Sequence, residues 1–366
     1  MGYLRLLLAS LVLSSHVTGF TSNYVGAVAV ECFYVISGFY IQMIIHEYYK
    51  GQTSWRRKFW ESRALRIFVP YWAVLGILYL LIPVLRHLWD GSWHFPDVLR
   101  AIKYHPLEAR TWLELLPNIF ILGSEHIKML IIVYQTYNPM MIAQAWSIGI
   151  ELLFYAIAPF LLMCRARVLV VSTLCGYLGK LALFCMYPDM PFHYSYGDIL
   201  FNTIFPLELC LFTTGALSYR FYARYLRERA LPNTLRLYIL LLVCITLASI
   251  ALALGMKTES RHHFVGIAPY ILYYAYVAFI ALLVPFLFRV SRNFSKDRLI
   301  GNCSYSFYLM HCYMMSYAAY LWPDSSCRIF IVAEILTLAG SLLIGKFIEA
   351  PLDRFRDRRF RRTHTT

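Results

Sequence analysis

Long apolar stretches, separated by short polar and basic segments, follow one another along almost the whole chain. Each runs for about 20 residues with few or no charges, which is the length that an α-helix needs to cross a bilayer. The stretches lie at residues 3–20, 25–45, 67–89, 141–164, 168–187, 199–219, 235–256, 265–288, 299–322 and 329–348. The pattern predicts an all-α polytopic membrane protein with about ten transmembrane helices.

Basic residues cluster in every second connection between these stretches. The first cluster follows the second stretch and holds Lys50, Arg56, Arg57, Lys58, Arg63 and Arg66, and the last forms a tail at about 352–366. Because Lys and Arg concentrate in cytoplasmic loops, this alternation predicts that both termini are cytoplasmic. We expect one membrane domain over residues 1–366. A more polar segment lies at 90–117, and the interrupted apolar segment 118–133 that follows it favours an interfacial or re-entrant element.

The composition supports a membrane protein, since 60% of residues are hydrophobic and only 15% are charged. The net charge of +14 could suit nucleic-acid binding, but the cations lie in loops and no soluble domain of useful size is left to carry such a motif. The nine cysteines include no C-x-x-C pair and mostly lie inside apolar stretches. We interpret them as small buried hydrophobic residues, and we expect neither disulfides nor a metal site.

The first apolar stretch contains two chemically active groups, Arg5 and His16. Eleven positions correspond to about three helical turns, so both side chains fall on nearly the same face, about 16 Å apart along the axis. That separation is close to the reach of an extended pantetheine arm. The alternative is that Arg5 only anchors the helix at the cytoplasmic surface and His16 only caps its other end.

Further ionisable residues lie within other predicted spans, namely Glu31, Glu151, Lys180, Glu208 and His311. Such groups usually line a cavity or pair with one another, because an isolated charge in the membrane is costly. Their similar depth favours a polar chamber that opens outward, whereas scattered helix–helix hydrogen bonds are the alternative. Arg63 and Arg66 share one helical face, and together with Arg5 they could surround a phosphate. In the second span, Ser37 and Gly38 favour close helix approach over a chemical role.

Six segments, taken together and in order, resemble the acyltransferase-3 family of integral-membrane O-acyltransferases along nearly the full chain. They are the Arg5/His16 pair, FYVISGFYI at 33–41, SRALRIFVPYW at 62–72, WSIGIELLFY at 146–155, GNCSYSFYLMH at 301–311 and IEAP at 348–351. The resemblance implies about ten core helices in a multi-pass protein of the bacterial inner membrane. It also implies acyl-CoA as co-substrate, with acetyl-CoA as the default and no tightly bound cofactor, and a carbohydrate or glycolipid hydroxyl as acceptor.

The resemblance further implies that His16 is the catalytic base, that Arg5 acts with it, and that Arg63 and Arg66 engage the donor. We expect Glu151 to orient the His16 ring and to stabilise the imidazolium. Possible contacts to the oxyanion or to the sugar come from Ser147, Tyr305 and His311, although each also suits a structural role.

Two other functions fit some of these features. Intramembrane charges around a polar cavity also suit a proton-coupled transporter or a lipid-linked sugar flippase. Such carriers often have pseudo-symmetric halves and broken helices at matching places, which this sequence does not clearly show. A purely structural partner in polysaccharide assembly would leave the Arg5/His16 pair unexplained.

Overall fold

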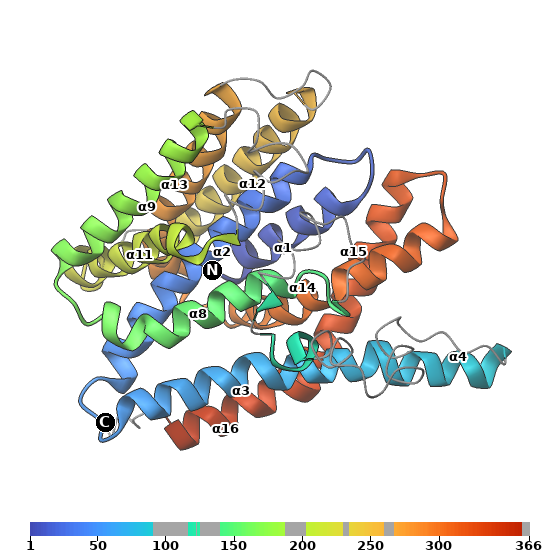
Figure 1. Ribbon diagram of the computed structural model, residues 1–366, viewed down its shortest axis with the longest axis horizontal. Coiled ribbons are helices and arrows are strands. Elements are labelled where there is room, and N and C mark those ends of the chain that lie inside the picture. The colour runs from blue at the N-terminus through green and yellow to red at the C-terminus, as the bar shows by residue number, and fades with distance from the viewer. Residues whose placement is uncertain are drawn as a thin grey trace.

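We describe the fold from a computed structural model (Figure 1). It describes residues 1–90, 116–121, 123–124, 140–186, 203–229, 234–259 and 267–360. The expected interfacial or re-entrant element at 118–133 therefore lies mostly outside the described residues. Within the described ranges every regular element is helical.

The described helices agree closely with the apolar stretches of the sequence. They are α1 (Gly2–His16), α2 (Asn23–Ile44), α3 (Trp55–Gly76), α4 (Ile82–Asp90), α8 (Ala145–Leu161), α9 (Ala166–Met186), α11 (Phe205–Phe221), α12 (Thr234–Glu259), α13 (Ile267–Ser291), α14 (Ser295–Leu321), α15 (Ser326–Ile344) and α16 (Ala350–Phe360). Short π-helical segments continue four of them, namely η1 (Ile45–Tyr49), η2 (Ile77–Leu81), η3 (Tyr222–Leu226) and η4 (Gly345–Glu349).

Several of these helices have the properties of membrane spans. Among the described residues, six helical segments are long and apolar enough to cross a bilayer: Asn23–Tyr49, Trp55–Val84, Ala166–Met186, Thr234–Gly255, Tyr270–Ser291 and Ser326–Phe360. α1 and α8 are apolar but have only 15 and 17 residues. α14 has 27 residues but begins with a polar turn. The chain is thus a multi-pass, all-helical membrane protein.

The third predicted span begins much earlier than the sequence pattern indicates. We expected a basic loop before residue 67, but α3 already starts at Trp55 and carries Arg63 and Arg66 in its third and fourth turns. Arg and Lys are good helix formers, and the exposed Arg57 pairs with Glu61 one turn later at 2.6 Å. Hydropathy marks where a helix enters the apolar phase and not where the helix begins, which is why this boundary was wrong.

α2 is the central helix of the bundle, and 78% of its most apolar window is buried. It crosses α11 at two glycines. A Cβ atom on Gly38 would lie 2.0 Å from the carbonyl oxygen of Phe212, and one on Gly215 would lie 1.9 Å from that of Val35. The two backbones therefore touch, which only glycine allows here, and the expected role of Gly38 in close helix approach is confirmed.

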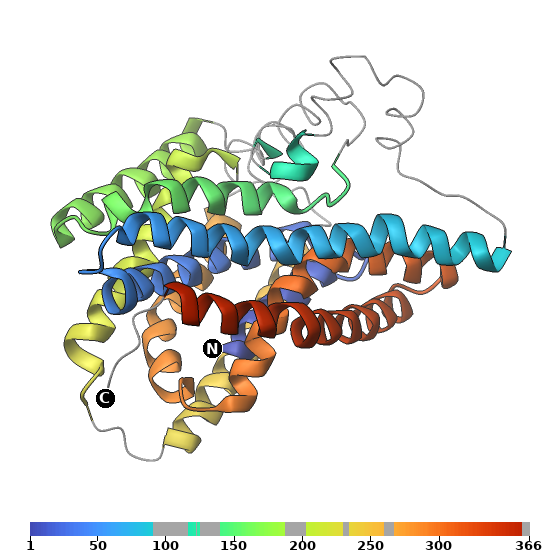
Figure 2. The same ribbon diagram turned by 90° about the horizontal axis from the view of Figure 1, so that it is seen from below.

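The remaining helices lie on opposite sides of α1 and α2. In Figure 1, α9, α11, α12 and α13 are on one side, and α3 with α16 runs along the other. Figure 2 shows α16 lying along α3. The buried Arg356 joins these two helices, since its Nε donates to the backbone oxygen of Ser62 at 2.9 Å. α3, η2 and α4 form one uninterrupted helix from Trp55 to Asp90.

Candidate functional site

α1 carries Arg5 and His16 towards its two ends, as the sequence pattern predicts. The start of α1 is held by Asp297 of α14, which accepts hydrogen bonds from the backbone N–H groups of Gly2 (2.8 Å) and Tyr3 (3.0 Å). Burial acts to raise the pKa of Asp297, but the amino group of Met1 and these two N–H groups outweigh it. The pKa of this carboxyl therefore lies below its usual value.

The three cations that the sequence predicts to act together do meet in the structure. Arg5 of α1 and Arg63 and Arg66 of α3 line one cavity of about 820 Å³. Arg63 is almost completely buried, whereas Arg66 is half-buried and lies 3.5 Å from Asp353 of α16. Gly301 of α14 packs against Gly2, and a Cβ atom there would lie 3.9 Å from a guanidinium nitrogen of Arg5. These close contacts fix where α1 presents its cation.

The cavity carries an excess of positive charge. Its lining includes seven arginines and five carboxylates, which leaves two positive charges in excess. Besides the three predicted arginines, these charged residues are Arg227, Arg292, Arg298, Arg354, Glu47, Glu151, Asp297, Asp353 and Asp357. Several guanidinium groups around one hollow suit a ligand with several phosphates, because each planar fork can donate two parallel hydrogen bonds.

Glu151 of α8 lies in this same cavity. Its carboxylate accepts hydrogen bonds from Ser37 of α2 and from Tyr155 one turn further along α8, each at 2.5 Å. Glu151 therefore lies among the arginines, and its described hydrogen bonds come from these two hydroxyls and not from the His16 ring. Two neutral donors hold the carboxylate in place while it offsets part of the cationic charge.

The cavity continues to a second polar group formed by α8 and α14. The hydroxyls of Ser147 and Tyr308 lie 2.7 Å apart, and both residues line the cavity. Gln144 donates to the backbone oxygens of Tyr308 (2.9 Å) and Leu309 (2.7 Å), which holds this part of α14 in register. Tyr305 also lines the cavity, and its hydroxyl donates to the backbone oxygen of Ile67 at 3.0 Å.

His16 and His311 form a pair immediately beyond this group. Their rings stack with centroids 5.4 Å apart, and His16 is exposed whereas His311 is fully buried. The Nδ1 atom of His311 lies 2.6 Å from the backbone oxygen of Tyr308. Since a carbonyl oxygen only accepts, Nδ1 carries the proton of the neutral ring and Nε2 has the lone pair. Tyr308 thus links the cavity to the histidine pair through its own backbone.

Comparison with known proteins identifies the family. Residues 1–346 match the family model acyltransferase-3, an acyltransferase domain. The chain belongs to the acyltransferase-3 family. No curated protein and no solved structure matches the chain. Membership confirms the resemblance and makes the protein a membrane acyltransferase.

In this acyltransferase, segments that are far apart in the sequence meet around one cavity. The segment at 33–41 supplies Ser37, the segment at 62–72 supplies the two α3 arginines, and the segment at 146–155 supplies Ser147, Glu151 and Tyr155. The segment at 301–311 supplies Tyr305 and Tyr308 to the cavity and ends at His311. Sequence reasoning missed Tyr308, Gln144 and the additional arginines. Their role depends on packing between α8 and α14, and no local pattern reports that packing.

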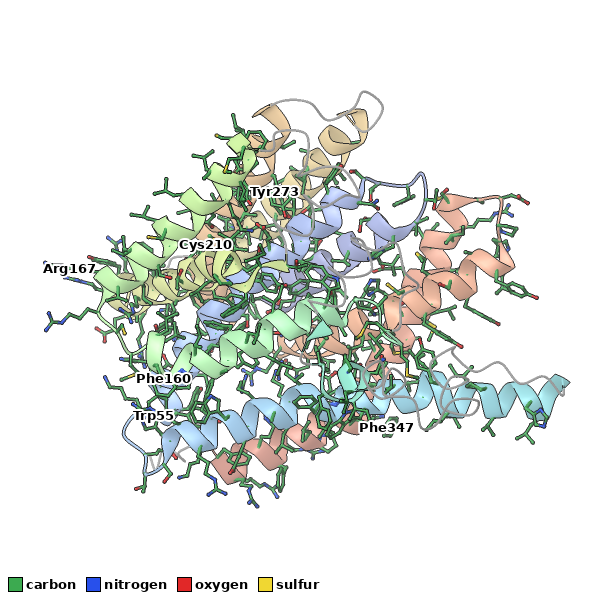
Figure 3. All side chains as sticks on the ribbon, in the orientation of Figure 1. Trp55, Phe160, Arg167, Cys210, Tyr273 and Phe347 are labelled. Carbon is green, nitrogen blue, oxygen red and sulfur yellow. The ribbon has the colours of Figure 1, made fainter. Side chains whose placement is uncertain are left out.

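A second group of buried charges does not join the acyltransferase cavity. Lys180 of α9 lies between Glu31 of α2 and Glu208 of α11, at 2.6 Å from each carboxylate, and all three side chains are buried. The ring of Tyr274 faces the ammonium group at 5.9 Å. Figure 3 shows Cys210 and Tyr273 among the packed side chains between α9, α11 and α13, whereas Arg167 points away from the bundle. These three ionisable residues pair with one another and do not line the outward-opening polar chamber that their similar depth favoured, so for them that expectation was wrong.

Proposed function

We propose that the protein transfers an acyl group, by default acetyl, from acyl-CoA to a hydroxyl of a carbohydrate or glycolipid. The proposal includes about ten spans, cytoplasmic termini and a location in the bacterial inner membrane. One observation carries it: a cavity lined by arginines reaches Tyr308, whose backbone oxygen holds His311, and the His16 ring stacks on His311. The proposed site thus combines an anion-binding region with a proton acceptor.

The proposed donor site lies among the arginines. The phosphates of acyl-CoA bind near Arg5, Arg63 and Arg66, and the pantetheine arm follows α1. The eleven residue steps from Arg5 to His16 span about 16 Å of helix, which brings a thioester at the end of this arm towards His16.

The proposed chemistry uses His16 as a general base. Its neutral imidazole accepts the proton of the acceptor hydroxyl while the hydroxyl oxygen attacks the thioester carbonyl. The carbon–sulfur bond then breaks, and the imidazolium returns the proton to the departing CoA thiolate. Ser147 and Tyr308 supply hydroxyl donors near the developing oxyanion, and Tyr305 and His311 are further candidates. Glu151 stabilises the imidazolium electrostatically from within the cavity. A route through an acyl-His16 intermediate uses the same residues.

The test is acyl transfer by detergent-purified protein with radiolabelled acetyl-CoA and a panel of glycans. Removing a general base costs about 10²–10⁴-fold in rate, so His16→Ala should lose nearly all transfer. Because His16 is exposed, the melting temperature of the His16→Ala protein should remain that of the wild type. His46→Ala is the matched control, since His46 is also exposed but lies near the opposite end of the helices at η1.

Normal turnover by folded His16→Ala would contradict the base assignment. Release of CoA by the wild type without labelled glycan would mean that the panel lacks the acceptor and that water replaces it. Folded wild type that neither binds acetyl-CoA nor cleaves its thioester would contradict the proposal and favour the transporter alternative.

A further inference from the structure

Three potential metal ligands gather where α1 ends beside α14. They are His16, His311 and Cys312, and their ligand atoms all lie within 4.8 Å of one another. α1 contributes one residue and α14 contributes the adjacent pair. This arrangement depends on packing between two helices almost 300 positions apart in the sequence. From the sequence alone, Cys312 therefore has only the features of a small buried residue in an apolar stretch.

The hydrogen bonds around His311 prepare it to bind a cation. Its Nδ1–H donates to the backbone oxygen of Tyr308, and its Nε2 lies 3.3 Å from the sulfur of Cys312. A metal-binding histidine commonly donates its other N–H to a carbonyl in this way, which fixes both the tautomer and the ring orientation. The Nε2 lone pair therefore points towards the thiol, and the His16 ring lies against the face of the same imidazole.

The ligand types select the metal. Two imidazoles and one thiolate suit Zn²⁺, which takes nitrogen at about 2.0–2.1 Å and sulfur at about 2.3 Å in a tetrahedral site. Ligand atoms of such a site lie roughly 3.3–3.7 Å apart, so atoms within 4.8 Å of one another need only small side-chain movements. Cys312 is partly buried and His16 is exposed, which gives the ion a route from water and a fourth position for a water molecule.

We propose that His16, His311 and Cys312 bind one Zn²⁺ ion and that this ion reversibly inhibits acyl transfer. On binding, the metal forms a bond to the sulfur of Cys312 and the thiol proton passes to solvent. The inhibition rests on the proposed function, because a His16 nitrogen that coordinates zinc has no lone pair for the acceptor proton. Zinc ligation and general-base catalysis are then mutually exclusive states of one residue.

Binding is tested separately from activity, on full-length protein purified without a histidine tag. Co²⁺ serves as the spectroscopic probe, because a cobalt–thiolate bond gives a charge-transfer band and a tetrahedral site gives strong visible bands. Zn²⁺ is then titrated to displace Co²⁺. The variants are His311→Ala and Cys312→Ser, and the matched control is Cys327→Ser, which removes an exposed cysteine outside the cluster.

We expect one equivalent of Co²⁺ in the wild type and in Cys327→Ser. Loss of a ligand should weaken binding at least about 10-fold, since even changes around a ligand cost about 10–100-fold in affinity. Cys312→Ser should also lose the charge-transfer band, and this result stands even if His311→Ala fails to fold. No stoichiometric binding by the wild type, or the same charge-transfer band in Cys312→Ser, would overturn the site.

Inhibition is tested in the transfer assay. Cys312→Ser keeps His16 and should retain transfer, but its zinc concentration for half inhibition should rise at least about 10-fold, and a chelator should restore wild-type activity. Activation by zinc, or equal inhibition of the wild type and Cys312→Ser, would overturn the inhibitory role. If no preparation transfers acyl groups, the proposed function fails, while the cobalt titration still decides the metal site.

Discussion

Two groups of cations lie inside this helical bundle, and their surroundings are opposite. Lys180 lies 2.6 Å from each of two buried carboxylates, and its own side chain is fully buried. Arg5, Arg63 and Arg66 instead share an 820 Å³ cavity in which arginines outnumber carboxylates. A buried cation enclosed by carboxylates has its charge compensated and no space for a ligand, whereas a cationic cavity has space and charge left for an anionic ligand.

The side-chain types match this difference. The ammonium of Lys180 is a compact point charge that fits between two carboxylates from neighbouring helices. The guanidinium groups are planar forks that can bind phosphate oxygens in pairs. We therefore expect substitution of Lys180 to affect folding, and substitution of a cavity arginine to affect substrate binding.

The largest expected effect is the loss of stability in Lys180→Met. Glu31 and Glu208 would then lie buried without their ammonium partner, and breaking a buried ion pair costs about 3–5 kcal/mol. Thermal unfolding in detergent measures the loss. The control combines Lys180→Met with Glu31→Gln and Glu208→Gln, which leaves no buried charge and should recover much of the stability. Equal loss in both proteins would show that packing, and not charge, dominates.

A smaller effect, limited to binding of the acyl donor, is expected for Arg66→Ala. A hydrogen bond to a charged group contributes about 1.5–3 kcal/mol, so the KM for acyl-CoA should rise roughly 10- to 100-fold with little change in kcat. Removal of the Arg66 guanidinium leaves Asp353 paired with Arg356 at 2.5 Å, so the stability of the protein should change little. Arg57→Ala is the control, because Arg57 lies on the same helix but is exposed and, among the described residues, pairs with Glu61. A raised KM in both variants would argue against a specific donor contact.

The smallest effect is expected for Asp297→Asn, which keeps a hydrogen-bond acceptor at the start of α1 but removes its charge. A charge at a helix N-terminus contributes about 0.3–1 kcal/mol. Asp297 also pairs with the Met1 ammonium, but burial lowers the pKa of that amino group, so it can lose its proton once the carboxylate is gone and no unpaired charge remains. Because the folded-state pKa of Asp297 is lowered, this contribution is fully present above the unfolded value of about 3.9 and disappears as pH falls through the folded pKa. The melting-temperature difference from wild type should therefore shrink under acid. A pH-independent difference would exclude a charge effect.

The helices were largely predictable from sequence, and the partners of their polar residues were not. Apolar length alone located α9 and α12 to within about three residues, since a membrane span has few other constraints. The arginines of α3 and α1 were correctly grouped because each lies at the same end of its span. For this grouping, the depth of each arginine along its helix was sufficient information.

Rotation of each helix about its axis was not predictable in the same way. α9 is apolar around most of its circumference, so no pattern shows that Lys180 points towards α2 and α11. For the same reason, the sequence does not show that the rings of His16 and His311 meet, because only the packing of α1 on α14 brings them together. These contacts join residues that are distant in the sequence, by 28 and 149 positions for the two partners of Lys180, and a single sequence contains no direct record of them.

The uninterrupted helix from Trp55 to Asp90 also affects how the protein responds to its lipid surroundings. Its segments of 22, 5 and 9 residues give a rod about 54 Å long, against a hydrocarbon core of about 30 Å. Only its apolar part, from about residue 67, has to match the bilayer, so the end of the helix that carries Arg63 and Arg66 projects from it. A change in bilayer thickness that alters the tilt of the apolar part therefore moves this end. Arg63 and Arg66 lie near one end of this lever. Membrane thickness is thereby coupled to the position of two cavity arginines, and we expect the affinity for the acyl donor to differ between thin and thick bilayers.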